Sequence, residues 1–215
     1  MNKKSIFNLI IWFGICLLCQ LANADQNIEI VGGNATGRPK IAVINFENDM
    51  QNGFADIIAS DLTITGEFNV IKYSSRDMIE SSIQYIISGN ATDTTLSFQL
   101  DSNINNNTKS STLINKNLGF DPKTPRRAAH MASNAIYKQL TNVPGAFTSK
   151  IAYIIKNGKV YSIIASDYDG YNQKILLSAH APIISLDWDN IGQQITYVTY
   201  ELNKPVVYVQ DLYKA

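Results

Sequence analysis

Cysteine and histidine are scarce in this chain of 215 residues, and their positions argue against several kinds of chemistry. The two cysteines, Cys16 and Cys19, lie in an apolar segment at the N-terminus. Removal of that segment would leave no thiol for a disulfide or for nucleophilic catalysis. The two histidines, His130 and His180, have no cysteine near them and no His-Glu-x-x-His spacing. We therefore expect no zinc centre and no catalytic triad.

An excess of charge of either sign is also missing. The sequence has 18 Lys and Arg residues against 18 Asp and Glu residues. Loss of the N-terminal segment, which contains Lys3 and Lys4, would leave a slight acidic excess. A protein without a basic field is not expected to bind nucleic acid.

Motifs of known enzyme and cofactor sites are incomplete or absent. No Gly-x-Ser-x-Gly nucleophile elbow occurs. The glycine-rich run 32–37 is followed by Arg38-Pro39 rather than by Lys and Ser/Thr, which favours a plain loop over a phosphate cradle. The run 167–170 (Asp-Tyr-Asp-Gly) resembles the start of a calcium loop, but Ser178 stands where that loop needs glutamate, which favours a hairpin turn. We predict no enzyme, no cofactor, no metal and no small-molecule substrate.

Residues 1–24 predict a signal peptide for secretion. Lys3 and Lys4 precede an apolar run from Ile6 to Leu21, and Ala22-Asn23-Ala24 fits the small-x-small pattern before a cleavage point. Cleavage is therefore expected between Ala24 and Asp25. A retained membrane anchor is the alternative, but a spanning helix needs about 20 apolar residues and this run is shorter. We expect an exported, soluble protein.

Residues 25–140 predict an α/β domain, in which a mixed sheet carries two main helices. Strands are expected at residues 28–31, 40–46, 68–73, 83–88, 95–100 and 113–120. One helix carries Phe54, Ile57, Ile58 and Leu62 at helical spacing and should end at Gly66.

The second main helix is expected over residues 125–140, with Thr124 as its cap and Pro125 at its first position. Its predicted apolar stripe includes Ala128, Met131 and Ile136. A short helix is expected over residues 75–81, and an Asn-rich turn over residues 101–110.

An internal repeat marks the C-terminal part of the chain. Residues 141–149, which contain Pro144-Gly145, read as a linker, and residues 150–215 carry only strand patterns. Ile151 returns as Ile195 and Ser166-Asp167 returns as Gln210-Asp211, both at an offset of 44. Strands are expected at residues 150–156, 161–167, 174–178, 194–200 and 206–211. Such a period predicts β-propeller blades.

A closed propeller needs roughly four to eight blades, and the sequence ends after about one and a half. We therefore expect an incomplete propeller after the α/β domain. The division is residues 1–24 (signal peptide), 25–140 (α/β domain), 141–149 (linker) and 150–215 (truncated propeller).

Several segments, in this order, resemble the TolB family of periplasmic proteins of the Tol-Pal envelope system. In the first domain they are residues 37–43 (Gly-Arg-Pro-Lys-Ile-Ala-Val) and 58–62 (Ile-Ala-Ser-Asp-Leu), followed by Gly66-Glu67-Phe68. The most specific are residues 145–153 and 166–172. The family's usual Trp-Ser-Pro-Asp-Gly turn is degenerate here, where residues 188–192 read Trp-Asp-Asn-Ile-Gly.

The resemblance implies a non-catalytic interaction protein of the periplasm that contributes to outer-membrane integrity and to envelope constriction during cell division. It implies contact with the inner-membrane protein TolA through the mature N-terminus. The residues concerned are Asp25, Gln26, Asn27, Ile28, Glu29, Ile30 and Val31. An extended apolar segment can add a strand to another sheet, although the pattern alone favours a strand of its own domain.

The family binds the outer-membrane lipoprotein Pal through its propeller, and we expect that contact to be lost from about one and a half blades. Alternative interpretations are a non-functional relic, one half of a split protein, or a fragment of an exported propeller hydrolase.

Overall fold

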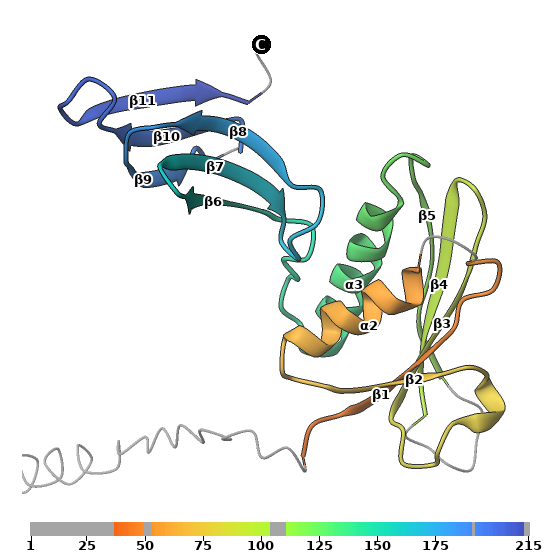
Figure 1. The fold of residues 1–215 in the computed structure, drawn as a ribbon. Coiled ribbons are helices and arrows are strands. Elements are labelled where there is room, and N and C mark those ends of the chain that lie inside the picture. The colour runs from red at the N-terminus through yellow and green to blue at the C-terminus, as the bar shows by residue number, and fades with distance from the viewer. Residues whose placement is uncertain (1–36, 50–52, 104–110, 191, 213–215) are drawn as a thin grey trace, which may run out of the picture. The chain divides into compact units, whose positions relative to one another are not determined.

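A mixed five-stranded sheet forms the first part of the fold (Figure 1). The structure is a computed structural model that describes residues 37–49, 53–103, 111–190 and 192–212. The signal peptide, its cleavage point at Ala24, the strand expected at residues 28–31 and most of the Asn-rich turn lie outside these residues. The strands are β1 (Lys40–Ile44), β2 (Asn69–Tyr73), β3 (Tyr85–Ala91), β4 (Thr95–Ser102) and β5 (Ser111–Gly119). Their order in the sheet is β2-β1-β3-β4-β5.

The sheet combines both kinds of pairing. Strand β1 runs parallel to β2 and to β3, whereas β3, β4 and β5 form an antiparallel meander. The parallel pair is joined by a helix, as a parallel connection requires. These observations confirm the expected mixed sheet.

Two helices, α2 (Phe54–Ile64) and α3 (Pro125–Thr141), pack beside each other on one face of the sheet (Figure 1). The alternation along β1 directs Ile41 and Val43 into the core under the helices, whereas Ala42 and Ile44 join a smaller cluster with Ile83. The main core is made by apolar side chains of α2, α3 and the inner face of the sheet. The domain therefore has two layers and two main helices, as its pattern predicts.

Three local predictions are wrong in part. The helix expected over residues 75–81 is only a three-residue 3₁₀ turn, Arg76–Met78, because an exposed segment of this length has no apolar face to stabilise it. Thr124 occupies the cap position of α3, but its side chain makes no capping hydrogen bond. Met131 is 41% exposed, since the buried stripe of α3 runs through Ala128, Ala132 and Ile136.

A buried carboxylate holds the 3₁₀ turn against the sheet. Asp101 is 1% exposed and accepts hydrogen bonds from Arg76, Gln99 and Thr112. Burial opposes its ionisation, but these hydrogen bonds outweigh that cost, and the pKa of Asp101 is lowered from its usual value.

We expect Asp101→Asn to lower the free energy of unfolding by about 1–3 kcal/mol at neutral pH, because it removes a charge-assisted network. A carboxylate whose pKa is lower in the folded state stabilises the folded protein at pH values above its unfolded pKa, which is 3.8 for Asp101. That contribution is lost as the pH falls through the pKa of the folded state. The difference between wild type and variant should therefore shrink below about pH 4. Urea unfolding between pH 3 and 7 measures it, with Asp77→Asn as the exposed control. A difference that does not change with pH would contradict the assignment.

Two antiparallel three-stranded sheets make up the second part of the fold. The first contains β6 (Lys150–Asn157), β7 (Val160–Asp167) and β8 (Lys174–Ala179). The second contains β9 (Ile183–Trp188), β10 (Gln194–Thr199) and β11 (Val206–Asp211). Each is a simple meander, and one buried cluster with Ile163 from the first sheet and Ile195 from the second lies between them. This arrangement agrees with the beginning of a propeller.

Strand β9 was not predicted, because its apolar residues do not alternate. Ile183 is buried and Leu186 packs against the same core, three positions later. The register with β10 shifts between Val198 and Thr199, and such a bulge inserts one residue and interrupts the period of two.

The 44-residue offset relates β6 to β10 and β7 to β11. Strand β10 lies between β9 and β11, whereas β6 has only β7 as a neighbour among the described residues. The position equivalent to β9 falls on residues 139–144, the end of α3 and the predicted linker. The two sheets are therefore different parts of the repeating unit rather than two identical blades.

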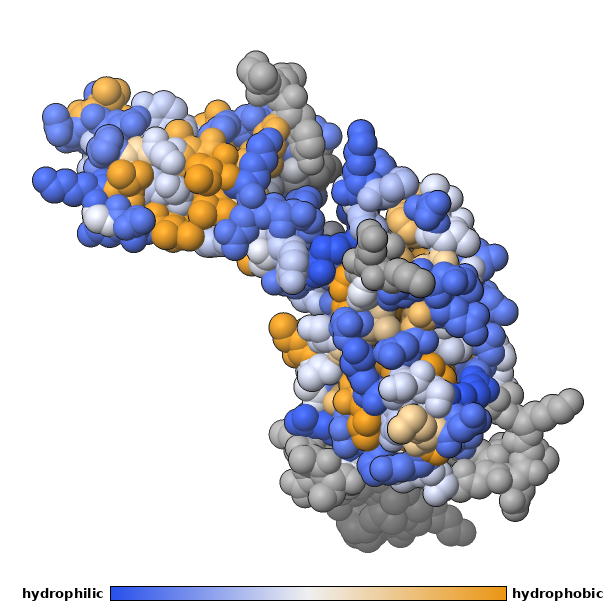
Figure 2. All heavy atoms as spheres, turned by 45° about the vertical axis from the view of Figure 1, so that its right-hand side comes forward, coloured by the Kyte–Doolittle hydropathy of each residue, from blue (hydrophilic) through white to orange (hydrophobic). Residues whose placement is uncertain are grey.

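Apolar side chains also gather on the surface of these sheets (Figure 2). Ile175, Ile184, Val207 and Val209 are each at least 60% exposed. A sheet with apolar residues on both faces is typical of an architecture in which each sheet is covered on two sides. In the described part of the chain, no helix is long and apolar enough to cross a bilayer.

Candidate functional site

The predicted partner-binding residues Asp25–Val31 and the cleavage point Ala24–Asp25 lie outside the described residues, so their roles stay predictions. The described residues instead bring together a cluster that the sequence analysis did not predict. It joins α2, α3 and the turn between β7 and β8, and consists of Asp61, Arg126, His130, Tyr168 and Asp169. We call it the Asp61 junction.

Its centre is a carboxylate and an imidazole buried between the two helices. Asp61 is 1% exposed and His130 is 3% exposed. Nδ1 of His130 lies 2.9 Å from Oδ2 of Asp61, and because a carboxylate only accepts hydrogen bonds, Nδ1 carries the proton. The other oxygen of Asp61 accepts a hydrogen bond from the hydroxyl of Tyr168. One carboxylate therefore connects both helices with the β7–β8 turn.

A second carboxylate lies on the other side of the imidazole. Asp169 accepts a hydrogen bond from Arg126, and its Oδ2 lies 3.4 Å from Nε2 of His130. The guanidinium carbon of Arg126 lies 3.5 Å from the centre of the Tyr171 ring, close enough for a cation–π contact. The turn after β7 is therefore held to the start of α3 by charge and by stacking.

The predicted linker is held to α3 at the same place. The backbone N–H of Phe147 donates to Oδ1 of Asn134, and Nδ2 of Asn134 donates to the hydroxyl of Thr148. The Phe147 ring packs between those of Tyr137 and Tyr168, with centroids 5.8 Å and 5.6 Å away. A Cβ on Gly145 would lie 2.4 Å from Oδ1 of Asn134, so the close approach of the chain needs glycine there.

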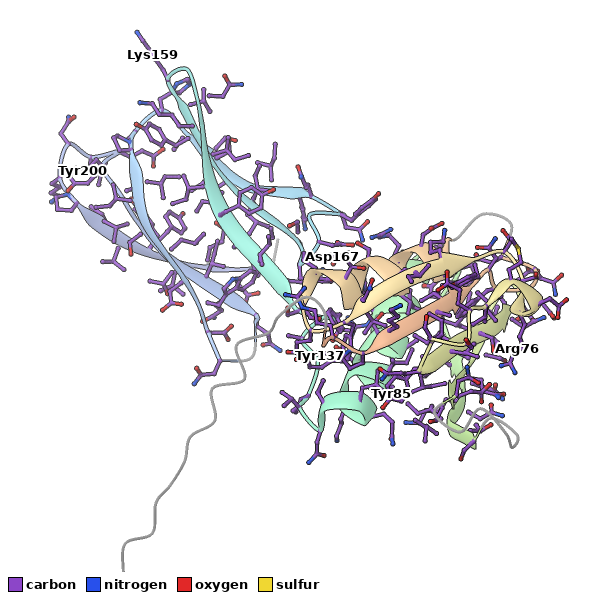
Figure 3. The ribbon with its side chains drawn as sticks, turned by 90° about the horizontal axis from the view of Figure 1, so that it is seen from below. Arg76, Tyr85, Tyr137, Lys159, Asp167 and Tyr200 are labelled. Atoms are coloured by element: carbon purple, nitrogen blue, oxygen red, sulfur yellow. The ribbon has the colours of Figure 1, made fainter. Side chains whose placement is uncertain are left out.

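Burial and hydrogen bonding set the protonation of Asp167, at the end of β7, and of Tyr168, in the turn that follows. Burial, and then the hydrogen bond to Asp61, raise the pKa of Tyr168 well above its usual range, so its hydroxyl stays a donor. Burial opposes ionisation of Asp167, but hydrogen bonds from Lys150 and Asn172 outweigh it and lower the pKa of that carboxyl. Figure 3 shows Asp167 at the end of β7 nearer the helices, and Lys159 at the opposite tip of the hairpin.

The junction has the parts of an acid–base dyad but not the access that one needs. Nε2 of His130 faces the carboxylate of Asp169 rather than a serine or cysteine, and the ring is almost completely buried. No group of three or more His, Cys, Asp or Glu residues in the described ranges is arranged to hold a metal ion. The geometry therefore suits a connection between elements rather than proton transfer to a substrate.

Sequence reasoning treated His130 as a helix residue without a partner, because its partners are distant in the chain. Asp61 lies 69 positions before it. A signal was nevertheless present. Asp61 lies in the run 58–62 and Tyr168 in the run 166–172, both of which carry the family resemblance, and the structure brings these two runs together.

Comparison with family models places both parts of the chain in one family. Residues 26–92 match the TolB amino-terminal domain, and residues 137–215 match the TolB beta propeller domain. The order of the two matches is the order in which the α/β sheet and the propeller-like sheets follow each other.

Individual relatives agree. The Tol-Pal system protein TolB of Bordetella avium is 33% identical over 218 residues, covering 95% of this chain and 49% of the relative. That of Acinetobacter baylyi is 33% identical over 229 residues, covering 99% of this chain and 53% of the relative. The crystal structure of TolB from Acinetobacter baumannii has a TM-score of 0.69 at 31% identity, covering 82% of this chain and 47% of that one. The chain spans about half the length of the curated relatives it matches. With both of its parts matched in order, the chain belongs to the TolB family.

Proposed function

We propose that this chain is a non-catalytic interaction protein of the Tol-Pal envelope system. Its place is the periplasm, after cleavage of residues 1–24, and its role is in outer-membrane integrity and envelope constriction during cell division. The observation that carries the proposal is the ordered match to the two TolB domains, together with curated relatives named as Tol-Pal system proteins.

The described residues support a role in binding rather than in catalysis. The one described histidine with carboxylate partners is buried in the Asp61 junction, where its two ring nitrogens face Asp61 and Asp169 rather than a serine or cysteine nucleophile. We also propose the division into an α/β domain at residues 25–140, a linker at 141–149 and propeller sheets from residue 150.

For the partner contact, we propose that residues 25–31 bind TolA as an added strand. A strand added to a sheet edge gains backbone hydrogen bonds along its length, and its alternate side chains enter pockets on one side. In such a strand Ile28 and Ile30 would share one face and Glu29 the other. Loops from many blades form the surface of a propeller, so the two sheets described here are not by themselves expected to bind Pal.

Deletion of residues 25–31 is expected to abolish TolA binding and leave the thermal unfolding midpoint unchanged, since the segment would carry its recognition in its own backbone and side chains. The double variant Ile28→Ser/Ile30→Ser should weaken binding at least about tenfold, while Glu29→Gln should change it little. Isothermal titration of each purified variant with TolA measures the binding. Unchanged binding after the deletion would overturn the assignment.

A further inference from the structure

A second feature lies beside the Asp61 junction, at the beginning of α3. A pocket of about 240 Å³ opens there between the first turn of α3 and the beginning of β6. Four Lys and Arg side chains line it, and Asp167 is the single carboxylate among its lining residues. The four are Lys123, Arg126, Arg127 and Lys150. In a chain whose acidic and basic residues balance, this is a local concentration of positive charge.

The position of the arginines is unfavourable for the helix alone. The first turn of α3 contains no acidic residue, although the positive end of a helix dipole favours acids and disfavours cations there. The expected cap, Thr124, makes no side-chain hydrogen bond that would compensate. An anion in the pocket would meet both the dipole and the cationic side chains.

Buried polar atoms without hydrogen-bond partners point to the same site. His130, which is 3% exposed, lines the pocket, and its Nε2 has no hydrogen-bond partner. Asp169 approaches Nε2 to 3.4 Å but makes no hydrogen bond with it. Nε of Arg126 is also buried without a partner. Buried polar groups are ordinarily paired, so two such atoms at one pocket indicate a missing hydrogen-bonding partner.

The lining also offers cations that are not used within the protein. Arg126 is paired with Asp169, and Lys150 with Asp167. Arg127 and Lys123 are exposed, and no ion pair with a described carboxylate is found for either. Two unpaired cations, two partly neutralised ones and the unpartnered Nε of Arg126 exceed what a carboxylate, with one charge and two oxygens, can satisfy. A phosphate group carries up to two charges and three acceptor oxygens, and arginine binds it in a fork.

From these observations we propose that this pocket binds a phosphate group. The group can belong to inorganic phosphate or to a lipid headgroup, and both present the same oxygens to Arg126 and Arg127, beside His130. The proposal does not depend on the Tol-Pal role or on residues 25–31.

Inorganic phosphate is the first probe, titrated at constant ionic strength into the whole protein. We expect saturable binding at one site and a shift of the His130 imidazole signals in the NMR spectrum. His180, the other histidine, is exposed and lies outside the pocket, so its signals should not move. The variant His180→Gln lacks the signals of His180 and so assigns the remaining imidazole signals to His130. Acetate at the same ionic strength should bind at least about tenfold more weakly, since it has fewer charges and acceptors.

The double variant Lys123→Gln/Arg127→Gln should weaken phosphate binding at least about tenfold. Both residues are exposed, so folding should be preserved. Lys159→Gln, at the far tip of the β6–β7 hairpin (Figure 3), is the matched control and should bind as the wild type does. Vesicles with phosphatidic acid in phosphatidylcholine form the second arm, with pure phosphatidylcholine vesicles as reference.

Binding of inorganic phosphate that the double variant loses would support a free phosphate. Binding of phosphatidic acid vesicles alone, lost in the same variant, would support a lipid headgroup. Absence of both, equal binding of acetate, or equal loss in Lys159→Gln would overturn the proposal.

Discussion

Asp61→Ala is expected to lower the free energy of unfolding by about 3–5 kcal/mol, because it removes the common acceptor of two buried hydrogen bonds. The substitution leaves Nδ1 of His130 and the hydroxyl of Tyr168 buried without their acceptor. It also disconnects the β7–β8 turn from α2. Urea unfolding followed by circular dichroism measures the change.

The same helix provides the control. Asp56 also lies on α2 and pairs with Lys72, but its side chain is 67% exposed. Exposed pairs contribute little, so Asp56→Ala should cost less than about 1 kcal/mol. Asp61→Asn keeps one oxygen as an acceptor and should fall between the two alanine variants. Equal losses for Asp56→Ala and Asp61→Ala would contradict the stabilising role of the Asp61 junction.

Gly89→Ala is expected to destabilise the α/β domain by about 3 kcal/mol, through overpacking in the centre of the sheet. A Cβ at position 89 would lie 2.4 Å from Cε2 of Phe46 and 2.5 Å from the carbonyl oxygen of Ser97. Phe46 is 6% exposed and the carbonyl belongs to the neighbouring strand β4, so neither can move without cost. The midpoint of thermal unfolding should fall accordingly.

Gly119 is the matched strand glycine. It lies on β5, and the nearest atom to an added Cβ is the Thr94 carbonyl oxygen at 4.0 Å. Gly119→Ala should therefore change the free energy of unfolding by no more than about 0.5 kcal/mol. The double variant Gly89→Ala/Phe46→Leu should recover part of the loss, because the smaller side chain relieves one of the two contacts. A cost for Gly89→Ala as small as that for Gly119→Ala would show that the sheet adjusts freely.

For the elements of the fold, the sequence was sufficient where its period was regular. The helical spacing of Phe54, Ile58 and Leu62 predicted α2, and the apolar run within residues 40–46 predicted β1. The helical spacing arises because α2 buries one face, which repeats at the period of the helix. The apolar run arises because both faces of β1 are buried. The internal repeat likewise predicted propeller strands, and the ordered family segments predicted the TolB match.

Where the apolar residues followed no regular period, the predictions of secondary structure were wrong. Strand β9 has a bulge in its pairing with β10, so its inward residues are three positions apart. A short helix was expected at residues 75–81, but the observed 3₁₀ turn, Arg76–Met78, buries no residue against a neighbouring element. Strand β9 depends on its pairing with β10, and the helix expected at residues 75–81 lacks an element to pack against. The sequence of a single segment does not contain either piece of information.

The amino-acid sequence by itself determined the succession of elements, the scarcity of catalytic residues, the predicted export signal and the family segments. Only the tertiary structure decided that Asp61, His130 and Tyr168 form one buried cluster, and that the arginines of α3 and Lys150 line a common pocket. The spacing of apolar residues shows which face of an element is buried, because the residues on one face recur at the period of that element. The pairing of particular polar groups depends on how distant elements pack, and residues 69 and 107 positions apart leave no local pattern of their contact.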